Sequence, residues 1–261
     1  MKLPMSVCII TLNEESPLAR CLKSIEGMAS QIVVVDSGST DRTKAVAKRF
    51  NADWYEEDWR GMRDQKNAAL DRCEEEWVLN LDADEELAPE LRDEITAFLS
   101  GGPVDSTGGA SFPRKSRFLG RWITHGDWYP DRKLRLFRRE AAKFGGDTGH
   151  DHVELRKGLS VHEMKSDLLH YSYPTVSSFL EKLNSFSEAH LDQALSKGKK
   201  WSLFGNVLRP WWRFFRGYVL RLGFLDGFPG YWIAKATAFS SFVRHSRLYE
   251  HENSDDRGSE K

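Results

Sequence analysis

The sequence has no long apolar run and little cysteine, and both absences exclude classes of protein. No stretch of 18 apolar residues occurs, so no segment is expected to span a membrane as a helix. The three cysteines, Cys8, Cys21 and Cys73, are odd in number and lack metal-ligand spacing, so we expect small core residues in a reducing compartment. Residues 3–12 are apolar, but one lysine before them and acidic residues after them make a poor signal peptide.

An excess of one charge is also missing. The chain carries 38 Lys and Arg against 39 Asp and Glu, a formal net charge of -1, which does not indicate nucleic-acid binding. Neither a G-x-G-x-x-G dinucleotide loop nor a Walker lysine loop is present. With 261 residues, 40% of them hydrophobic and 30% charged, the chain is long enough for one large domain or for one domain with an appendage.

The first 100 residues alternate between strand-like and helix-like patterns. Apolar, β-branched runs predict strands at 5–12, 31–37, 52–58 and 76–82. Helices are predicted from an N-cap at Ser16 and at 43–50, 62–73 and 89–99. Apolar strands that alternate with helices predict an α/β fold with a mostly parallel, doubly wound sheet flanked by helices.

Polar residues gather where the predicted strands end, which is where open parallel sheets bind ligands. The first strand ends in Thr11, Leu12, Asn13 and Glu14, the second in Asp36, and the fourth in Asp82 and Asp84. Asp36 could accept a hydrogen bond from a nucleotide hydroxyl or ring N–H, or it could cap the turn that follows it. Both interpretations stay open on the residues alone.

The pair Asp82 and Asp84 suggests a metal site. In extended backbone, residues two apart point to the same face, and two adjacent carboxylates repel each other. A divalent ion, Mg²⁺ or Mn²⁺, bound by these carboxylates and by substrate phosphate oxygens would offset that repulsion and stabilise a departing diphosphate. The alternative for a lone D-x-D pair is a solvated loop after a core strand.

Four motifs in this region, "TLNEE", "VVVDSGSTD", "RDQKNAAL" and "LNLDADEEL", resemble the family 2 glycosyltransferases with the GT-A fold over residues 5–100. The resemblance implies that the first strand end and the aspartate of the second strand hold a nucleotide-sugar. It assigns this role to Thr11, Leu12, Asn13, Glu14, Asp36 and Asp82. It also places Gln65, Lys66 and Asn67 near the ribose and diphosphate, although Lys66 could equally lie on a solvated helix face.

The middle of the chain is similar to a subgroup of this family that adds sugars to the lipopolysaccharide inner core. The similarity lies in "DWYPDRKLRLFRRE", "FGG", "HDHVEL" and "DLLHYSYPTVSSFLEKLNSFS". In that subgroup, a V-H-E motif after the glycine pair supplies the general base. This chain has "GHDHVEL" instead, so we align His150 and Asp151 with the His-Glu pair and predict Asp151 as the base, with Glu154 as the alternative. A polar turn without catalytic function is the structural alternative.

Inverting transfer requires one such carboxylate, because the attacking acceptor hydroxyl must lose its proton. The diphosphate leaving group needs no second acid, unlike the leaving group of a glycoside hydrolase. His170 and the arginines at 132, 135 and 138 are weaker candidates. Each could bind substrate, or could be structural or lie on a solvated face.

The segment 201–249 combines seven basic residues with a single acid, Asp226. A predicted helix at 207–222 places three arginines, at 209, 213 and 216, opposite Trp211, Phe214, Phe215, Tyr218 and Leu222. This pattern is typical of a helix lying in an anionic membrane interface. A helix docked onto the catalytic domain is the alternative.

The sequence therefore predicts an inverting, metal-dependent glycosyltransferase. Its expected reaction moves a hexose from a UDP-sugar to a lipopolysaccharide-core or similar membrane glycolipid at the cytoplasmic face of the inner membrane. UDP-glucose is the expected donor. We expect residues 1–100 to be the nucleotide-sugar-binding half of a GT-A domain and 101–175 the acceptor and catalytic half. A helical extension at 176–249 and a disordered tail at 250–261 complete the expected organisation.

Three alternatives stay open. The acceptor could be a polyprenyl phosphate, an exopolysaccharide or a protein. The chain could also be a non-catalytic module that binds sugar nucleotides or membranes. A D-x-D phosphohydrolase is disfavoured, because in those enzymes the motif follows the first strand.

Overall fold

The computed structural model describes residues 2–146, 152–173 and 175–255, and the chain divides into two compact units. The first unit comprises Met1–Arg114 and Asp131–Tyr171, and the second comprises Lys115–Pro130 and Ser172–Lys261. This division differs from the expected boundaries at 100 and 175, because residues 115–130 group with the C-terminal helices.

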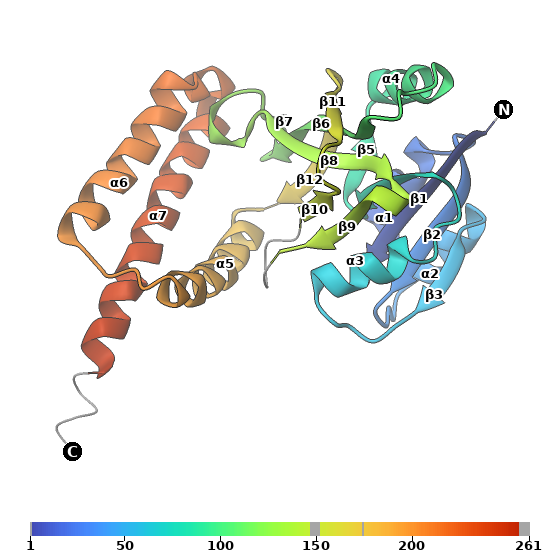
Figure 1. Ribbon diagram of the computed structural model, residues 1–261. Coiled ribbons are helices and arrows are strands. Elements are labelled where there is room, and N and C mark those ends of the chain that lie inside the picture. The colour runs from blue at the N-terminus through green and yellow to red at the C-terminus, as the bar shows by residue number, and fades with distance from the viewer. Residues whose placement is uncertain (1, 147–151, 174, 256–261) are drawn as a thin grey trace. The chain divides into compact units, whose positions relative to one another are not determined.

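The first unit is built on a parallel sheet, as the sequence predicts (Figure 1). Its strands are β1 (Leu3–Thr11), β2 (Ala29–Asp36), β3 (Asp53–Glu56) and β4 (Trp77–Asp82), which pair in parallel in the order β3-β2-β1-β4. The helices between and after them are α1 (Glu15–Ser24), α2 (Thr43–Arg49), α3 (Met62–Leu70) and α4 (Pro89–Ser100). Glu14, and not Ser16, is the N-cap of α1, so that predicted cap is wrong by two residues.

Antiparallel strands extend this sheet beyond β4. They are β5 (Glu85–Leu87), β6 (Thr107–Phe118), β8 (Asp131–Arg138) and β12 (Leu168–Tyr173), in the order β4-β8-β6-β12-β5. Two short strands, β7 (Arg121–Trp122) and β11 (Ser160–Glu163), pair with β6. A separate antiparallel pair joins β9 (Ala142–Gly145) to β10 (His152–Leu155), and the 3-10 turn η2 (Arg139–Ala141) precedes β9.

Alternate side chains of β1 enter two different hydrophobic clusters, one on each face of the sheet. Met5, Val7 and Ile9 pack with α1 and α4, whereas Cys8 and Ile10 pack with α3 and β9 on the other face. This arrangement explains why the strand is apolar at nearly every position, since helices or strands cover both faces. All three cysteines are buried and free, as predicted.

The second unit is helical. It contains η1 (Gly126–Trp128), α5 (Val176–Ser196), α6 (Leu203–Phe215), a π-helical turn η3 (Arg216–Leu220), η4 (Gly223–Asp226) and α7 (Gly227–Asp255). Figure 1 shows α6 and α7 lying side by side, in orange and red. The buried Asp226 carboxylate accepts hydrogen bonds from the backbone N–H groups of Thr124 and His125 at 3.0 and 2.8 Å, which fixes the start of α7.

Residues 250–255, expected to begin a disordered tail, are helical. The Glu252 carboxylate accepts a hydrogen bond from the backbone N–H of Trp201 at 2.8 Å, and the Asn253 side chain donates to the Tyr249 carbonyl. The first contact holds the end of α7 against the segment that precedes α6, the second lies within α7, and the polar composition alone does not reveal either. None of the helices in the described ranges is both long enough and apolar enough to cross a membrane.

The predicted amphipathic helix at 207–222 forms as α6 and the π-helical turn η3, and two of its three arginines contact other parts of the helical unit. Arg209 Nη1 lies 3.1 Å from His245 Nε2 on α7, and Arg216 Nη2 donates to both oxygens of Asp127 at 2.8 and 2.9 Å. The opposite face of α6 is exposed, with Phe204 and Trp211 at 74% and 63% of their possible accessible area. These two arginines therefore contact other parts of the helical unit. Part of the predicted aromatic face is also covered, because Phe214 and Tyr218 pack on Tyr231 of α7 with ring centroids 6.1 and 5.7 Å apart.

Candidate active site at the carboxyl edge of the sheet

The ends of β1, β2 and β4 meet in register at one edge of the sheet. Thr11 pairs with Asp36 across β1 and β2, and Ile10 pairs with Asp82 across β1 and β4. The predicted nucleotide-binding and metal-binding side chains are therefore gathered at the carboxyl edge, where parallel sheets bind their ligands.

The loops after β1 and β2 are joined by hydrogen bonds. Asn13 adopts a left-handed conformation (φ 55°), which asparagine tolerates better than most residues. Its side-chain oxygen accepts from the Thr40 backbone at 2.8 Å, and its own N–H donates to Ser39 Oγ at 2.7 Å. The Glu14 N–H donates to Thr43 Oγ1 at 2.9 Å, while Leu12 is exposed. Residues 12–14 and 39–43 thus form one hydrogen-bonded rim.

Asp36 is buried and caps the turn that follows it. Its Oδ2 accepts from the N–H groups of Gly38 and Ser39 at 2.9 and 2.7 Å, and its Oδ1 accepts from the Ser39 hydroxyl. The capping interpretation is therefore confirmed. It leaves room for a ligand as well, because each carboxylate oxygen has two lone pairs.

Two buried polar atoms beside Asp36 have no hydrogen-bond partner within the described residues: Thr11 Oγ1 and Gln65 Oε1. Gln65 is otherwise anchored, since its Nε2 donates to Ser37 Oγ at 3.1 Å. Buried polar atoms are normally hydrogen-bonded, so these two indicate a place where a ligand supplies the missing donors.

Lys66 is buried and forms an ion pair with Asp82. Its Nζ lies 2.9 Å from Asp82 Oδ1, while Arg135 Nη2 lies 2.5 Å from Asp82 Oδ2. Burial alone would raise the pKa of Asp82, but Arg135 and Lys66 outweigh it and hold that pKa well below its usual range. The solvated-face alternative for Lys66 is therefore wrong.

Arg135 connects Asp82 to a second buried acid. Its guanidinium also lies 2.7 Å from Glu85 Oε1 and donates to Asn80 Oδ1 at 2.9 Å, and Arg114 contacts Glu85 at 3.2 Å. Although burial opposes the charge of Arg135, Asp82 and Glu85 raise its pKa. Sequence reasoning missed this role, and the available signal was the position of Arg135 between two apolar residues of one strand.

Asp84 faces His170 instead of Asp82. Residues 83 and 84 form a turn, so the extended backbone assumed for the D-x-D pair is wrong. Asp84 Oδ2 lies 3.4 Å from His170 Nε2, and the Asp84 carbonyl accepts from the Tyr171 N–H at 3.0 Å. β12 brings His170 to this position by pairing with β5, where His170 lies opposite Glu85.

The donor set at Asp84 and His170 fits a divalent ion. A carboxylate oxygen and an imidazole nitrogen are ordinary ligands for Mn²⁺, and a carboxylate is the usual protein ligand of Mg²⁺. Among the described residues, no cluster of three or more His, Cys, Asp or Glu is arranged to hold a metal. Asp84 and His170 could therefore hold a divalent ion only if other groups, such as phosphate oxygens, completed its coordination.

Asn67 anchors the β9–β10 hairpin to α3. Its amide nitrogen donates to the Phe144 carbonyl and its amide oxygen accepts from the Phe144 N–H, both at 2.9 Å. The Lys66 ammonium lies 5.8 Å from the centre of the Phe144 ring. The hairpin that precedes and follows the predicted base therefore borders the Lys66–Asp82 pair.

Of the two base candidates, Asp151 lies outside the described residues and Glu154 is on β10. The Glu154 carboxylate lies over Gly145, where a Cβ would collide with it, and it is 3.6 Å from both Lys143 Nζ and His152 Nε2. The other two arginines of β8 have structural partners. Arg132 donates to the Met164 carbonyl at 3.0 Å, and Arg138 pairs with Glu76 and stacks on Trp77.

Comparison with known proteins identifies the family. Residues 6–160 match the Glycosyl transferase family 2 model, which covers more than half of the chain. The chain belongs to glycosyltransferase family 2. It is 32% identical over 255 residues to the lipopolysaccharide core biosynthesis glycosyltransferase LpsC of Rhizobium meliloti (strain 1021), covering 95% of this chain and 93% of that protein. It is 30% identical to an uncharacterised glycosyltransferase of Rickettsia typhi, covering 94% of this chain and 87% of the relative.

Among solved structures, this family 2 chain is similar in fold to the mannosyltransferase PcManGT of Pyrobaculum calidifontis, solved with GDP-Man and Mn²⁺. The TM-score is 0.59 at 16% identity, and the match covers 95% of this chain and 88% of the other. The predicted family, the GT-A fold with a helical C-terminal extension, and the enzyme class are thereby confirmed. The protein is a nucleotide-sugar glycosyltransferase, and the phosphohydrolase alternative is excluded.

Proposed function

We propose that this glycosyltransferase is inverting and metal-dependent. It transfers a hexose from a UDP-sugar to a lipopolysaccharide-core or similar membrane glycolipid, and UDP-glucose is the proposed donor. The observation that carries the proposal is the juxtaposition of Asp84 and His170 with the Lys66–Asp82–Arg135 network at the carboxyl edge of the sheet. The near full-length similarity to LpsC supports the class of acceptor.

In the proposal, the joined loops after β1 and β2 hold the nucleotide. Asp36, Asn13 and Glu14 border the base and ribose, and Thr11 and Leu12 line the entrance. The unpartnered Thr11 Oγ1 and Gln65 Oε1 support this assignment, because a nucleoside offers N–H and O–H donors to both. Asn67 has an indirect role in the proposal, because its side chain positions β9.

Asp84 and His170 are the proposed protein ligands of Mg²⁺ or Mn²⁺. When bound, the ion would neutralise charge on the departing diphosphate. Asp82, the other predicted ligand, has each carboxylate oxygen beside a cation, so we assign it first to orienting Lys66 and Arg135 toward the diphosphate. Two fixed cations placed where charge develops stabilise a leaving group without reorganising during the reaction.

Asp151 is the proposed general base, and Glu154 is the alternative. Either would take the proton of the acceptor hydroxyl as that oxygen forms its bond to the anomeric carbon. The anchoring of β9 by Asn67 supports a base on this hairpin, because it holds Gly145 and Gly146 beside α3; Arg63 Nη1 donates to the Gly146 carbonyl at 3.5 Å.

Peripheral contact with the cytoplasmic face of the inner membrane is proposed through the exposed side of α6. Six apolar residues there recur with helical spacing on one face and are at least 43% exposed: Leu203, Phe204, Val207, Leu208, Trp211 and Trp212. A stripe of this composition suits burial at the boundary between head groups and acyl chains. This stripe takes the place of Phe214 and Tyr218, which pack on α7, as the proposed contact with the hydrocarbon region.

The proposed function is tested by measuring UDP release from UDP-glucose, UDP-galactose and UDP-N-acetylglucosamine, with Mn²⁺ and with EDTA. Lipopolysaccharide truncated to its inner core serves as the acceptor, and GDP-mannose serves as the control donor. Acceptor-stimulated release from one UDP-sugar, abolished by EDTA, is expected. Turnover that persists in EDTA would contradict the proposed metal requirement. Turnover of GDP-mannose alone would contradict the proposed UDP-sugar donor.

A further inference from the structure

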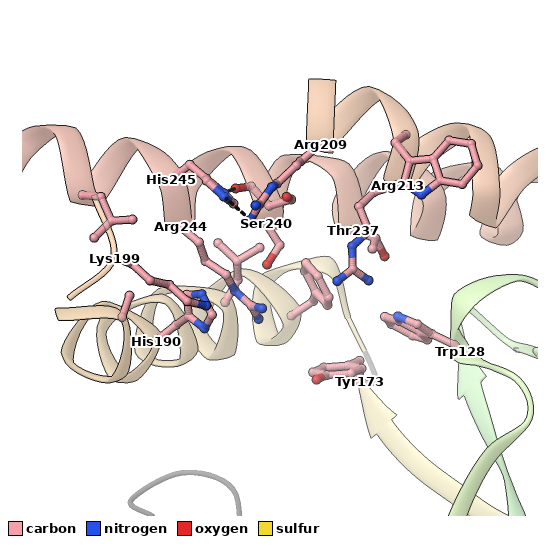
Figure 2. A pocket seen from close by; sticks show the side chains of 16 residues that line it. Trp128, Tyr173, His190, Lys199, Arg209, Arg213, Thr237, Ser240, Arg244 and His245 are labelled. Atoms are coloured by element: carbon pink, nitrogen blue, oxygen red, sulfur yellow. Dashed lines mark hydrogen bonds between the residues drawn. The ribbon is translucent and has the colours of Figure 1, made fainter. Parts of the chain in front are cut away.

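The helical unit contains a cavity of about 520 Å³ lined by α5, α6, α7 and the Trp128 turn (Figure 2). Six of its lining residues are basic: His190, Lys199, Arg209, Arg213, Arg244 and His245. In Figure 2 the side chains of Arg213 and Arg244 extend into the space between the helices, and Trp128 and Tyr173 lie at one end of it. None of the described lining residues is acidic.

Three cations of this cavity have no acidic partner in the part of the chain that the structure describes. Among the described residues, no carboxylate lies within ion-pair distance of Lys199, Arg213 or Arg244. Their neighbours differ, because Arg216 is paired with Asp127 and Arg247 lies 3.5 Å from Glu188. Within residues 2–146, 152–173 and 175–255, the fold therefore pairs two arginines beside the cavity and leaves Arg213 and Arg244 inside it without an acidic partner.

Arg244 shows that this arrangement is unfavourable in the empty protein. Its Nε is buried and has no hydrogen-bond partner in the described part of the chain. Burial and the neighbouring Arg213 both lower its pKa. Because a partly buried cation beside a like charge is destabilising, a bound anion would offset that cost.

The lining indicates the chemistry of that anion. Arginine guanidinium groups match the oxygen geometry of phosphate, and Thr237, Ser240 and Ser241 add hydroxyl groups. Trp212 both lines the cavity and belongs to the exposed apolar stripe of α6, so the two surfaces are continuous. A ligand that uses both surfaces has a phosphate at one end and hydrocarbon at the other.

We propose that this cavity binds the phosphorylated head group of an anionic lipid, with the lipid's acyl chains against the apolar stripe of α6. The site deepens the membrane part of the proposed function and rests on that part alone, because the donor site is built entirely from the first unit. It gives the enzyme a way to recognise a phosphate-bearing amphiphile separately from the sugar donor.

The test is sedimentation of the full chain with phosphatidylcholine vesicles, with and without phosphatidic acid. Wild type should bind the phosphatidic acid vesicles more tightly, and Arg213→Gln/Arg244→Gln should bind them about thirtyfold less, given about a factor of five for each basic residue at such a surface. The matched control is Lys197→Gln/Lys200→Gln, which removes the same charge from exposed positions outside the cavity. Equal losses in the two variants would overturn the cavity site.

Two further arms remove the remaining ambiguities. The Arg213→Gln/Arg244→Gln variant should melt no lower than wild type, and Arg244→Lys, which keeps the charge, should bind between wild type and the double variant. Inorganic phosphate tests whether the cavity binds a soluble anion and not a lipid. If phosphate saturates the wild-type cavity and the protein does not bind vesicles, the proposal of a lipid ligand is contradicted. UDP-sugar turnover without acceptor should be unchanged in every variant, so failure of turnover in wild type would contradict the donor proposal and leave the vesicle result standing.

Discussion

At the scale of single residues, the site depends on which carboxylates are paired and with what. Asp82 has a cation beside each oxygen, whereas Asp84 lies beside an imidazole. Two aspartates that look equivalent in the sequence therefore have different environments. In the proposed mechanism, the first aspartate orients fixed charges and the second is a metal ligand.

The metal proposal predicts that Asp84→Asn and His170→Gln each weaken the Mn²⁺-dependent gain in UDP affinity. Each variant removes one of the two proposed protein ligands of the metal. Losing a residue that only hydrogen-bonds to a metal ligand typically costs about 10- to 100-fold, so we expect the loss of turnover here to exceed about a hundredfold. Calorimetric titration of UDP with and without Mn²⁺ measures the effect independently of activity. Asp93→Asn, an exposed change on α4, is the control. Normal Mn²⁺ dependence in both site variants would move the metal elsewhere.

The depressed pKa of Asp82 predicts a specific dependence of stability on pH. A carboxyl group whose pKa is lower in the folded than in the unfolded chain stabilises the fold above its unfolded value of about 3.9, and this stabilisation is lost as the pH falls below that value. Asp82→Asn should therefore be less stable than wild type at neutral pH, and the difference should shrink in acid. Urea unfolding between about pH 7 and pH 3 measures both. A constant difference across that range would contradict the ion-pair explanation.

At the scale of elements, the hairpin β9–β10 links the binding half of the site to the predicted chemistry. Asn67 fixes one strand of the hairpin to α3, and Glu154 on the other strand lies across Gly145. A side chain at 145 would occupy the space of that carboxylate and would force Glu154 to take another position.

This arrangement makes the two base candidates separable. Asp151→Asn should reduce turnover by about 10²- to 10⁴-fold, the usual contribution of a general base, with UDP-sugar affinity unchanged. Glu154→Gln is the matched variant on the same hairpin. If Glu154→Gln abolishes turnover and Asp151→Asn does not, the role passes to Glu154. Loss of donor affinity in Asp151→Asn would instead indicate a structural turn.

Sequence patterns predicted where the strands and helices lie better than which side chains they bring into contact. Apolar runs located the four parallel strands, because both faces of those strands are buried and the pattern is continuous. The sequence did not predict the partners of Arg135 and His170, because strand pairings bring these two residues to Asp82, Glu85 and Asp84 across separations of 50 residues or more. For α6, the amphipathic pattern showed that two faces differ, but it did not indicate which face is outward.

At the scale of the whole molecule, the outer face of α6 predicts that membrane binding has an apolar component independent of head-group charge. Phe204→Glu/Trp211→Glu should reduce binding to vesicles with and without phosphatidic acid by more than about tenfold, since each side chain buried in the interface contributes about 1.5–3 kcal/mol. Val104→Glu, at an equally exposed apolar position in the first unit, is the control. Vesicle binding unchanged in the double variant would exclude this face as the lipid contact.

The division of the chain into units has a consequence for how the enzyme could be dissected. The chain passes from one unit to the other at Arg114, at Pro130 and at Tyr171, so the helical unit is an insertion joined to a C-terminal segment. Phe118 and Ile123 of the insertion are buried against Ile233 of α7. Truncation near residue 175 would therefore uncover an apolar surface on the remaining fragment. The C-terminal helices therefore share their core with residues 115–130 and cannot be removed as a separate domain.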